Sequence, residues 1–192
     1  MINELKEKYF NLNTINIYAK EIGKGPLVIM VHGWPESWYS WRHQLKPIAD
    51  LGYKVLAIDV RGYGQSSMPY EVEQYDMLSL VGDIINIIDA ENVENAILIG
   101  HDWGAPICWT AAALYPNKIK AVIGLSIPHS RRGNISNMEL WRQIYKDKFF
   151  YQTYFEKEGV AEKELEKDIG SSLRQIYHWI SAEGHDAKIR TN

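Results

Sequence analysis

The sequence predicts an α/β protein with a mostly parallel sheet, and three features of the chain indicate this. Short apolar runs without charged residues recur over the first 125 residues, as in strands that are buried on both faces. Segments with helical spacing of apolar residues separate these runs, and such alternation is typical of a parallel sheet. Glycine and proline interrupt the chain between the segments, for example at Gly23–Pro26.

The elements follow one another in a regular order. The expected strands are two short ones over residues 7–20 (with Asn11–Asn13 in the turn), then 27–31, 54–58, 96–99 and 121–125. The expected helices are residues 38–51, ended by Gly52, then 72–90 and 105–115. In the helix over 72–90, one face is expected to carry Leu78, Val81, Ile84, Ile85 and Ile88.

The composition changes at a polar linker over residues 129–134. Beyond it the chain is charged, aromatic and helical in pattern, with no strand-like run. We therefore expect a sheet-containing domain over residues 1–128 and a separate helical segment over residues 129–192, which forms part of a cap over a pocket.

Charge and composition exclude several classes of protein. The net charge is −3, which does not favour binding to nucleic acid or to an anionic membrane surface. No apolar run approaches the length of a membrane span, and the first residues lack the apolar stretch of a signal peptide, so a cytoplasmic location is expected. The single cysteine, Cys108, is expected in the core.

The most informative residue is Asp102. The strand predicted over 96–99 runs into Gly100, and a helix is predicted directly after Gly104, so Asp102 lies on a sharp strand-to-helix turn flanked by glycines. This is the small-x-nucleophile-x-small layout of a nucleophile elbow, with aspartate as the nucleophile. An ionised carboxylate is favoured there by the N-terminus of the following helix.

A second loop is expected beside this turn. His32-Gly33-Trp34-Pro35-Glu36 follows the strand over 27–31, and the carboxyl ends of parallel strands meet at one edge of a sheet. The backbone N–H groups of Trp34 and Trp103 are therefore expected to stabilise an oxyanion. After the next strand, pairing of Asp59 with Arg61 is expected to shape the neighbouring loop.

Together, the segments His32–Glu36, Arg61–Ser66 and Gly100–Pro106 resemble the soluble epoxide hydrolases of the α/β-hydrolase fold. The resemblance runs over nearly the whole chain. It includes Tyr151–Phe155, which is similar to the segment of the family's cap that carries a tyrosine.

The resemblance implies a function and a set of site residues. Asp102 would attack an epoxide carbon and form a covalent ester, and Tyr151, with Tyr154 as the substitute, would donate a proton to the opening oxygen. Water would then hydrolyse the ester to a vicinal diol, with no metal or cofactor. The expected substrate is a small apolar epoxide, in contact with His32, Pro35, Trp103, Gln152 and Tyr154.

The sequence also departs from the family pattern. In this fold an acid and then a water-activating histidine follow the nucleophile along the chain. We expect the chain to stop before the last strands of the sheet, with only part of the cap and without that acid and histidine. His129, His178 and His185 are not expected to replace the base, and Asp168 and Asp186 are expected to be surface charges. The strand over 121–125 is expected to expose an unpaired apolar edge.

Two other functions stay open at this point. Haloalkane dehalogenases share the aspartate at this turn, but they usually carry Asn or Glu after the His-Gly pair, where this chain has Trp34. A non-catalytic ligand-binding member of the fold, or an inert fragment, is the alternative from another class. The oligomeric state is not indicated by the sequence.

Overall fold

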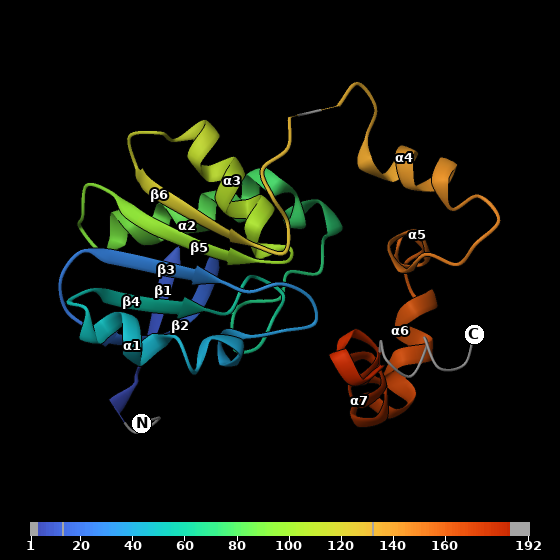
Figure 1. Ribbon diagram of the computed structural model, residues 1–192, viewed down its shortest axis with the longest axis horizontal. Helices are drawn as coiled ribbons and strands as arrows, with labels where there is room; N and C mark the ends of the chain where they lie inside the picture. Colours follow the sequence, from blue (N-terminus) through green and yellow to red (C-terminus); the bar gives the residue numbers. More distant parts are fainter. Residues whose placement is uncertain (1–3, 13, 132, 185–192) are drawn as a thin grey trace. The chain divides into compact units, whose positions relative to one another are not determined.

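The computed structural model describes residues 4–12, 14–131 and 133–184. The chain divides into two compact units, Met1–Ser130 and Arg131–Asn192 (Figure 1).

The first unit is built on one six-stranded sheet with the order β1-β2-β4-β3-β5-β6 (Figure 1). The strands are β1 (Lys6–Leu12), β2 (Ile15–Gly23), β3 (Leu27–Val31), β4 (Lys54–Ile58), β5 (Ala96–His101) and β6 (Ile119–Leu125). β3 pairs in parallel with β4 and β5, and β5 pairs in parallel with β6. β2 pairs antiparallel with both β1 and β4. The predicted α/β fold with a mostly parallel sheet is confirmed, and β3 and β4 have the predicted bounds.

Two hydrophobic layers cover the sheet. On one face, alternate residues of β3 such as Leu27 and Ile29 pack with α2 (Met77–Ala90) and α3 (Gly104–Leu114). On the other face, Val28 and Met30 pack with Trp41 and with α1 (Leu45–Asp50). Because all five residues of β3 are buried, the continuous apolar run in the sequence reflects burial on both faces.

Two predicted helices are shorter than expected. The prediction of a helix over 38–51 is wrong, because a 3₁₀ turn (η2, Trp38–Trp41) and the short α1 replace it. Pro47 has no backbone N–H, so it fits the first turn of α1 but would break a longer helix.

The helix predicted over 72–90 begins at Met77, after a 3₁₀ turn (η3, Val72–Tyr75). The Asp76 side chain accepts a hydrogen bond from Ser79 N at 2.6 Å and caps the helix there. Of the five apolar residues predicted on one face, Leu78 is 66% exposed and the other four are buried.

β6 is an edge strand among the described residues, because it pairs there with β5 alone. Its side chains are largely exposed, and Ile123 and Leu125 are among the exposed large apolar residues. The sheet is therefore open at β6, as the sequence predicts.

The second unit consists of helices and turns in its described residues. These helices are α4 (Asn137–Ile144), α5 (Tyr151–Phe155), α6 (Val160–Leu165), η4 (Glu166–Asp168) and α7 (Ile169–Ile180). In the described part of both units, no helix is both long and apolar enough to cross a lipid bilayer.

Candidate active site

Asp102 lies on a sharp turn between β5 and α3, in the left-handed region of backbone conformation with φ +49°. Non-glycine residues rarely adopt this conformation, which costs about 1–3 kcal/mol and is often found at functional sites. The flanking glycines allow the turn to close. A Cβ atom on Gly100 would lie 2.4 Å from the Gly104 carbonyl oxygen, and one on Gly104 would lie 2.1 Å from the Val31 oxygen.

The loop after β3 contacts this turn directly. The Trp34 backbone N–H donates to Asp102 Oδ1 at 2.9 Å. The approach is so close that a Cβ atom on Gly33 would lie 2.4 Å from the same oxygen. The two segments meet because β3 and β5 are parallel neighbours, with Val31 opposite Gly100. The Trp34–Pro35 peptide bond is cis.

Trp103 follows Asp102 at the N-cap position of α3, and its side chain is exposed. Its predicted role as the second N–H donor to an oxyanion stays a prediction.

His32, which was expected to contact the substrate, is buried and bound to backbone. The side chain is 1% exposed, Nε2 accepts a hydrogen bond from Val60 N at 3.0 Å, and Nδ1 lies 2.8 Å from the Gly33 oxygen. Since Nε2 accepts, Nδ1 carries the proton and the ring is neutral, and burial lowers its pKa. Both nitrogens are engaged with backbone, so His32 fixes the loop, and a substrate-contacting role does not fit this position.

Glu36 lies beside the turn, and its role does not follow from the sequence alone. Its Oε2 atom accepts a hydrogen bond from Gly33 N at 3.2 Å and lies 3.1 Å from His101 Nδ1. His101, which directly precedes Asp102, therefore contacts this carboxylate. The signal in the sequence was an acidic residue three positions after Gly33, but its partner lies 65 residues away.

The expected pairing of Asp59 with Arg61 is wrong. The Arg61 guanidinium forms two hydrogen bonds with the carboxylate of Asp83 on α2, at 2.8 and 2.7 Å. Asp59 instead accepts from the backbone N–H groups of Trp38 at 2.8 Å and Gln65 at 3.0 Å. Asp59 thus joins the loops that follow β3 and β4, and Arg61 anchors the second loop to α2.

Tyr63 lies in the loop after β4 and packs edge-on to His32, with ring centroids 5.0 Å apart. Burial, and then the negative charge of Asp102, raise the pKa of Tyr63 to about 12. Its phenol therefore stays protonated near neutral pH.

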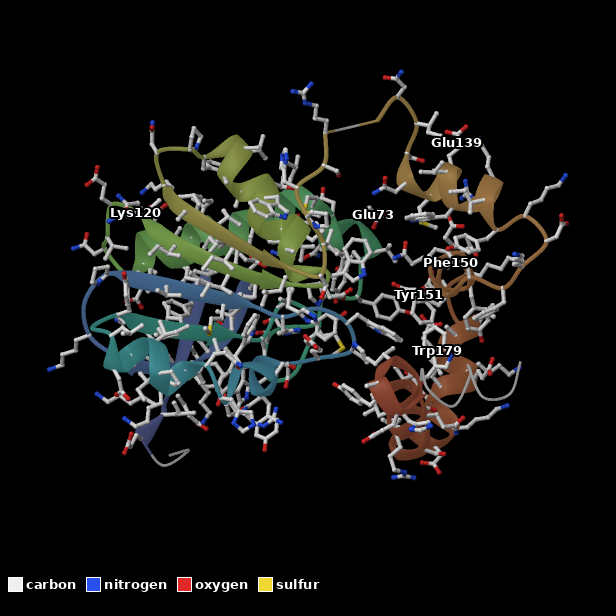
Figure 2. All side chains as sticks on the ribbon, in the orientation of Figure 1. Glu73, Lys120, Glu139, Phe150, Tyr151 and Trp179 are labelled. Atoms are coloured by element: carbon white, nitrogen blue, oxygen red, sulfur yellow. The ribbon has the colours of Figure 1, made fainter. Side chains whose placement is uncertain are left out.

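The two tyrosines expected to act on the substrate, Tyr151 and Tyr154, belong to α5, and Figure 2 shows Tyr151 beside Phe150. The two rings are 5.1 Å apart, and Gln152 Nε2 donates to the Tyr151 oxygen at 3.0 Å. The Tyr154 hydroxyl donates to the Glu164 carboxylate at 2.5 Å, and this bond raises the pKa of Tyr154. Tyr154 is thereby a weaker acid than an ordinary tyrosine.

The histidines and aspartates that were not expected to serve as a water-activating base or its acid partner lie as follows. The His129 ring lies edge-on to Trp109 at 5.8 Å, and His178 belongs to α7. The Asp168 side chain caps α7 by accepting from Ser171 N at 2.9 Å. His185 and Asp186 lie outside the described residues.

Cys108 is buried, and burial raises the pKa of its thiol. Within the described ranges, no group of three or more His, Cys, Asp or Glu side chains could hold a metal ion.

Comparison with known proteins identifies the family. The family described as alpha/beta hydrolase fold matches residues 26–182. Epoxide hydrolase A of Mycobacterium tuberculosis is 39% identical over 88% of this chain, and bifunctional epoxide hydrolase 2 of Sus scrofa is 38% identical over 85% of it.

Solved structures give the same result. The crystal structure of epoxide hydrolase A from Mycobacterium thermoresistibile has a TM-score of 0.90 with 40% identity over 96% of this chain. An epoxide hydrolase from an endophytic Streptomyces has a TM-score of 0.84 with 43% identity over 86% of the chain.

The chain spans only part of these relatives. It covers 53% of the M. tuberculosis protein, 29% of the Sus scrofa protein, and 59% and 50% of the two solved chains. With the family match over residues 26–182 and the shared sheet, this chain belongs to the α/β-hydrolase fold family, and the relatives named above are epoxide hydrolases.

Proposed function

We propose that the protein hydrolyses an epoxide to a vicinal diol through a covalent ester on Asp102. The observation that carries this proposal is the hydrogen bond from Trp34 N to Asp102 Oδ1, on a turn with the layout of a nucleophile elbow. The similarity to epoxide hydrolases gives the reaction class.

The hydrogen bond suggests that the two carboxylate oxygens of Asp102 have different roles. Oδ1, held by Trp34 N–H, becomes the carbonyl oxygen of the ester, and Oδ2 attacks the epoxide carbon. As the new C–O bond forms, the ring C–O bond breaks and leaves an alkoxide. In this scheme the N–H groups of Trp34 and Trp103 stabilise the oxyanion that forms on Oδ1 when water attacks the ester.

The alkoxide takes its proton from the Tyr151 phenol. Gln152 supports this assignment, because its amide donates to the Tyr151 oxygen and so stabilises the phenolate that remains after the transfer. Tyr154 is the weaker candidate, since its hydroxyl is engaged with Glu164. By this proposal, residues 129–192 form part of a cap that supplies the proton donor, and Pro35, Trp103 and Gln152 contact a small apolar epoxide.

Release of the diol requires a base that activates water. In the first unit, His32 is bound to backbone, His43 is exposed, His101 contacts Glu36, and His129 lies against Trp109. We propose that none of these four histidines activates the water and that the 192-residue chain accumulates the ester, because a general base contributes about 10²–10⁴-fold to the step that it serves.

Mass spectrometry of the intact protein tests the proposal. A terminal aryl epoxide should add its whole mass once to the chain, and Asp102→Ala should abolish the adduct, whereas the exposed control Asp50→Ala should leave it unchanged. A parallel incubation with a bromoalkane distinguishes the dehalogenase alternative, in which alkylation releases bromide. An adduct of unchanged yield on Asp102→Ala would show that another group attacks, and more than one diol per chain would contradict the expected accumulation.

A further inference from the structure

We propose that Glu36 is a positioning residue for Asp102. Through one carboxylate oxygen it holds the loop that carries the Trp34 N–H against the end of β5, beside the nucleophile. The inference rests on the proposed function, in which Asp102 attacks the substrate and Trp34 N–H holds its second oxygen.

Both donors converge on the same atom of Glu36. Gly33 N donates to Oε2 at 3.2 Å, and His101 Nδ1 lies 3.1 Å from Oε2. The Glu36 side chain is only 15% exposed, and its own backbone N–H bonds back to the Gly33 oxygen at 3.1 Å. The carboxylate is thus held close to the loop that it orients.

The direction of each hydrogen bond follows from the chemistry. An ionised carboxylate can only accept, so His101 carries a proton on Nδ1. Gly33 and Trp34 are consecutive, and their N–H groups serve two different carboxylates, those of Glu36 and Asp102. His101 and Asp102 are also consecutive, so the four residues and Glu36 close a ring of covalent and hydrogen bonds.

This ring explains why Glu36 affects the nucleophile without touching the substrate. Two other hydrogen bonds of the loop lead to the end of β4: His32 accepts from Val60 N, and Trp38 N donates to Asp59. Glu36 instead contacts His101, the last residue of β5, which directly precedes Asp102. Without Glu36, the loop loses this connection to the end of β5 beside Asp102.

The test distinguishes the length of the Glu36 side chain from its negative charge. Glu36→Gln keeps the length and one oxygen that can accept from both donors, but removes the charge. Glu36→Asp keeps the charge but is shorter by one methylene group, and Glu36→Leu removes the acceptor. Glu73→Leu, an exposed glutamate on η3, is the control for loss of a negative charge (Figure 2).

The first measurement is the single-turnover rate at which a terminal aryl epoxide alkylates Asp102, followed by intact mass. Glu36→Leu and Glu36→Asp should slow this step by up to ~10²-fold, as misplacement of a reacting group by about 1 Å does. Glu36→Gln and Glu73→Leu should react like the unmodified chain. Equal rates in all four variants, or Glu36→Gln as slow as Glu36→Leu, would overturn the proposal.

The second measurement is amide hydrogen exchange at Gly33 and Trp34, followed by NMR, and it does not require any reaction. Faster exchange in Glu36→Asp than in Glu36→Gln supports the positioning role, and equal exchange contradicts it. If the unmodified chain is not alkylated at all, the proposed function fails, while the exchange rates still decide the role of Glu36. If Glu36→Leu does not fold, the comparison of Gln with Asp decides alone.

Discussion

Replacement of Gly33 by alanine should slow the reaction of Asp102 with an epoxide and leave the rest of the fold largely unchanged. The new Cβ atom would lie 2.4 Å from both Cβ and Oδ1 of Asp102, whereas ordinary contacts of this kind begin at 3.4 Å. The groups must therefore separate by at least about 1 Å, since the turn that holds Asp102 is itself packed against Val31 through Gly104. A retreat of that size lengthens the 2.9 Å bond from Trp34 N to Oδ1 beyond the range of a hydrogen bond.

The magnitude follows from the displacement of the attacking carboxylate. Misplacement of a reacting group by about 1 Å costs about 10²-fold in rate, which corresponds to about 2.7 kcal/mol at 1.36 kcal/mol per factor of ten. We therefore expect Gly33→Ala to slow alkylation of Asp102 by an epoxide by about 10²-fold.

The assay is the time course of the covalent adduct by intact mass, at saturating epoxide. Gly82→Ala is the matched control, because Gly82 lies in α2, where an added Cβ atom would meet open space and the backbone has no positive φ. That control should keep the rate and gain about 0.5–1 kcal/mol of stability from helix propensity. A Gly33→Ala chain that alkylates as fast as the control would refute the assigned role of the Trp34 N–H.

Two further predictions concern stability. Asp83→Leu should destabilise the first unit by about 3–5 kcal/mol, because it leaves the buried Arg61 guanidinium without its carboxylate, and the double variant Arg61→Met/Asp83→Leu should recover most of the loss in urea unfolding. Burial opposes ionisation of Glu21, but hydrogen bonds from Lys8 and Lys54 outweigh it and hold the pKa of Glu21 below its usual value. Because the pKa of Glu21 is lower in the folded than in the unfolded chain, ionised Glu21 stabilises the fold at pH values above its unfolded pKa. This stabilisation is lost as the pH falls through the folded pKa. The difference in unfolding free energy between the unmodified chain and Glu21→Gln should then shrink between pH 7 and pH 3, and a constant difference would contradict this explanation.

Local sequence was sufficient to predict the central strands and the turn that carries Asp102. The segments 27–31 and 54–58 matched the bounds of β3 and β4. The first is wholly apolar and the second is apolar after Lys54, because the part of a strand that is buried on both faces needs no polar residue. The glycines at 100 and 104 marked the turn, since only the absence of Cβ atoms lets β5 and α3 approach so closely. These requirements are met by residues that are close together in the sequence, so the sequence reveals them.

The partners of the polar residues, in contrast, depend on the tertiary fold. Arg61 bonds to Asp83 rather than to Asp59, and Glu36 reaches His101 from 65 residues away, because parallel strands and their helices bring distant segments to one edge of the sheet. His32 is a buried residue bound to backbone for the same reason. The chemical type of a side chain determines which hydrogen bonds it can form, but the fold determines which donor or acceptor lies within reach. Burial then makes an unpaired polar group costly in free energy.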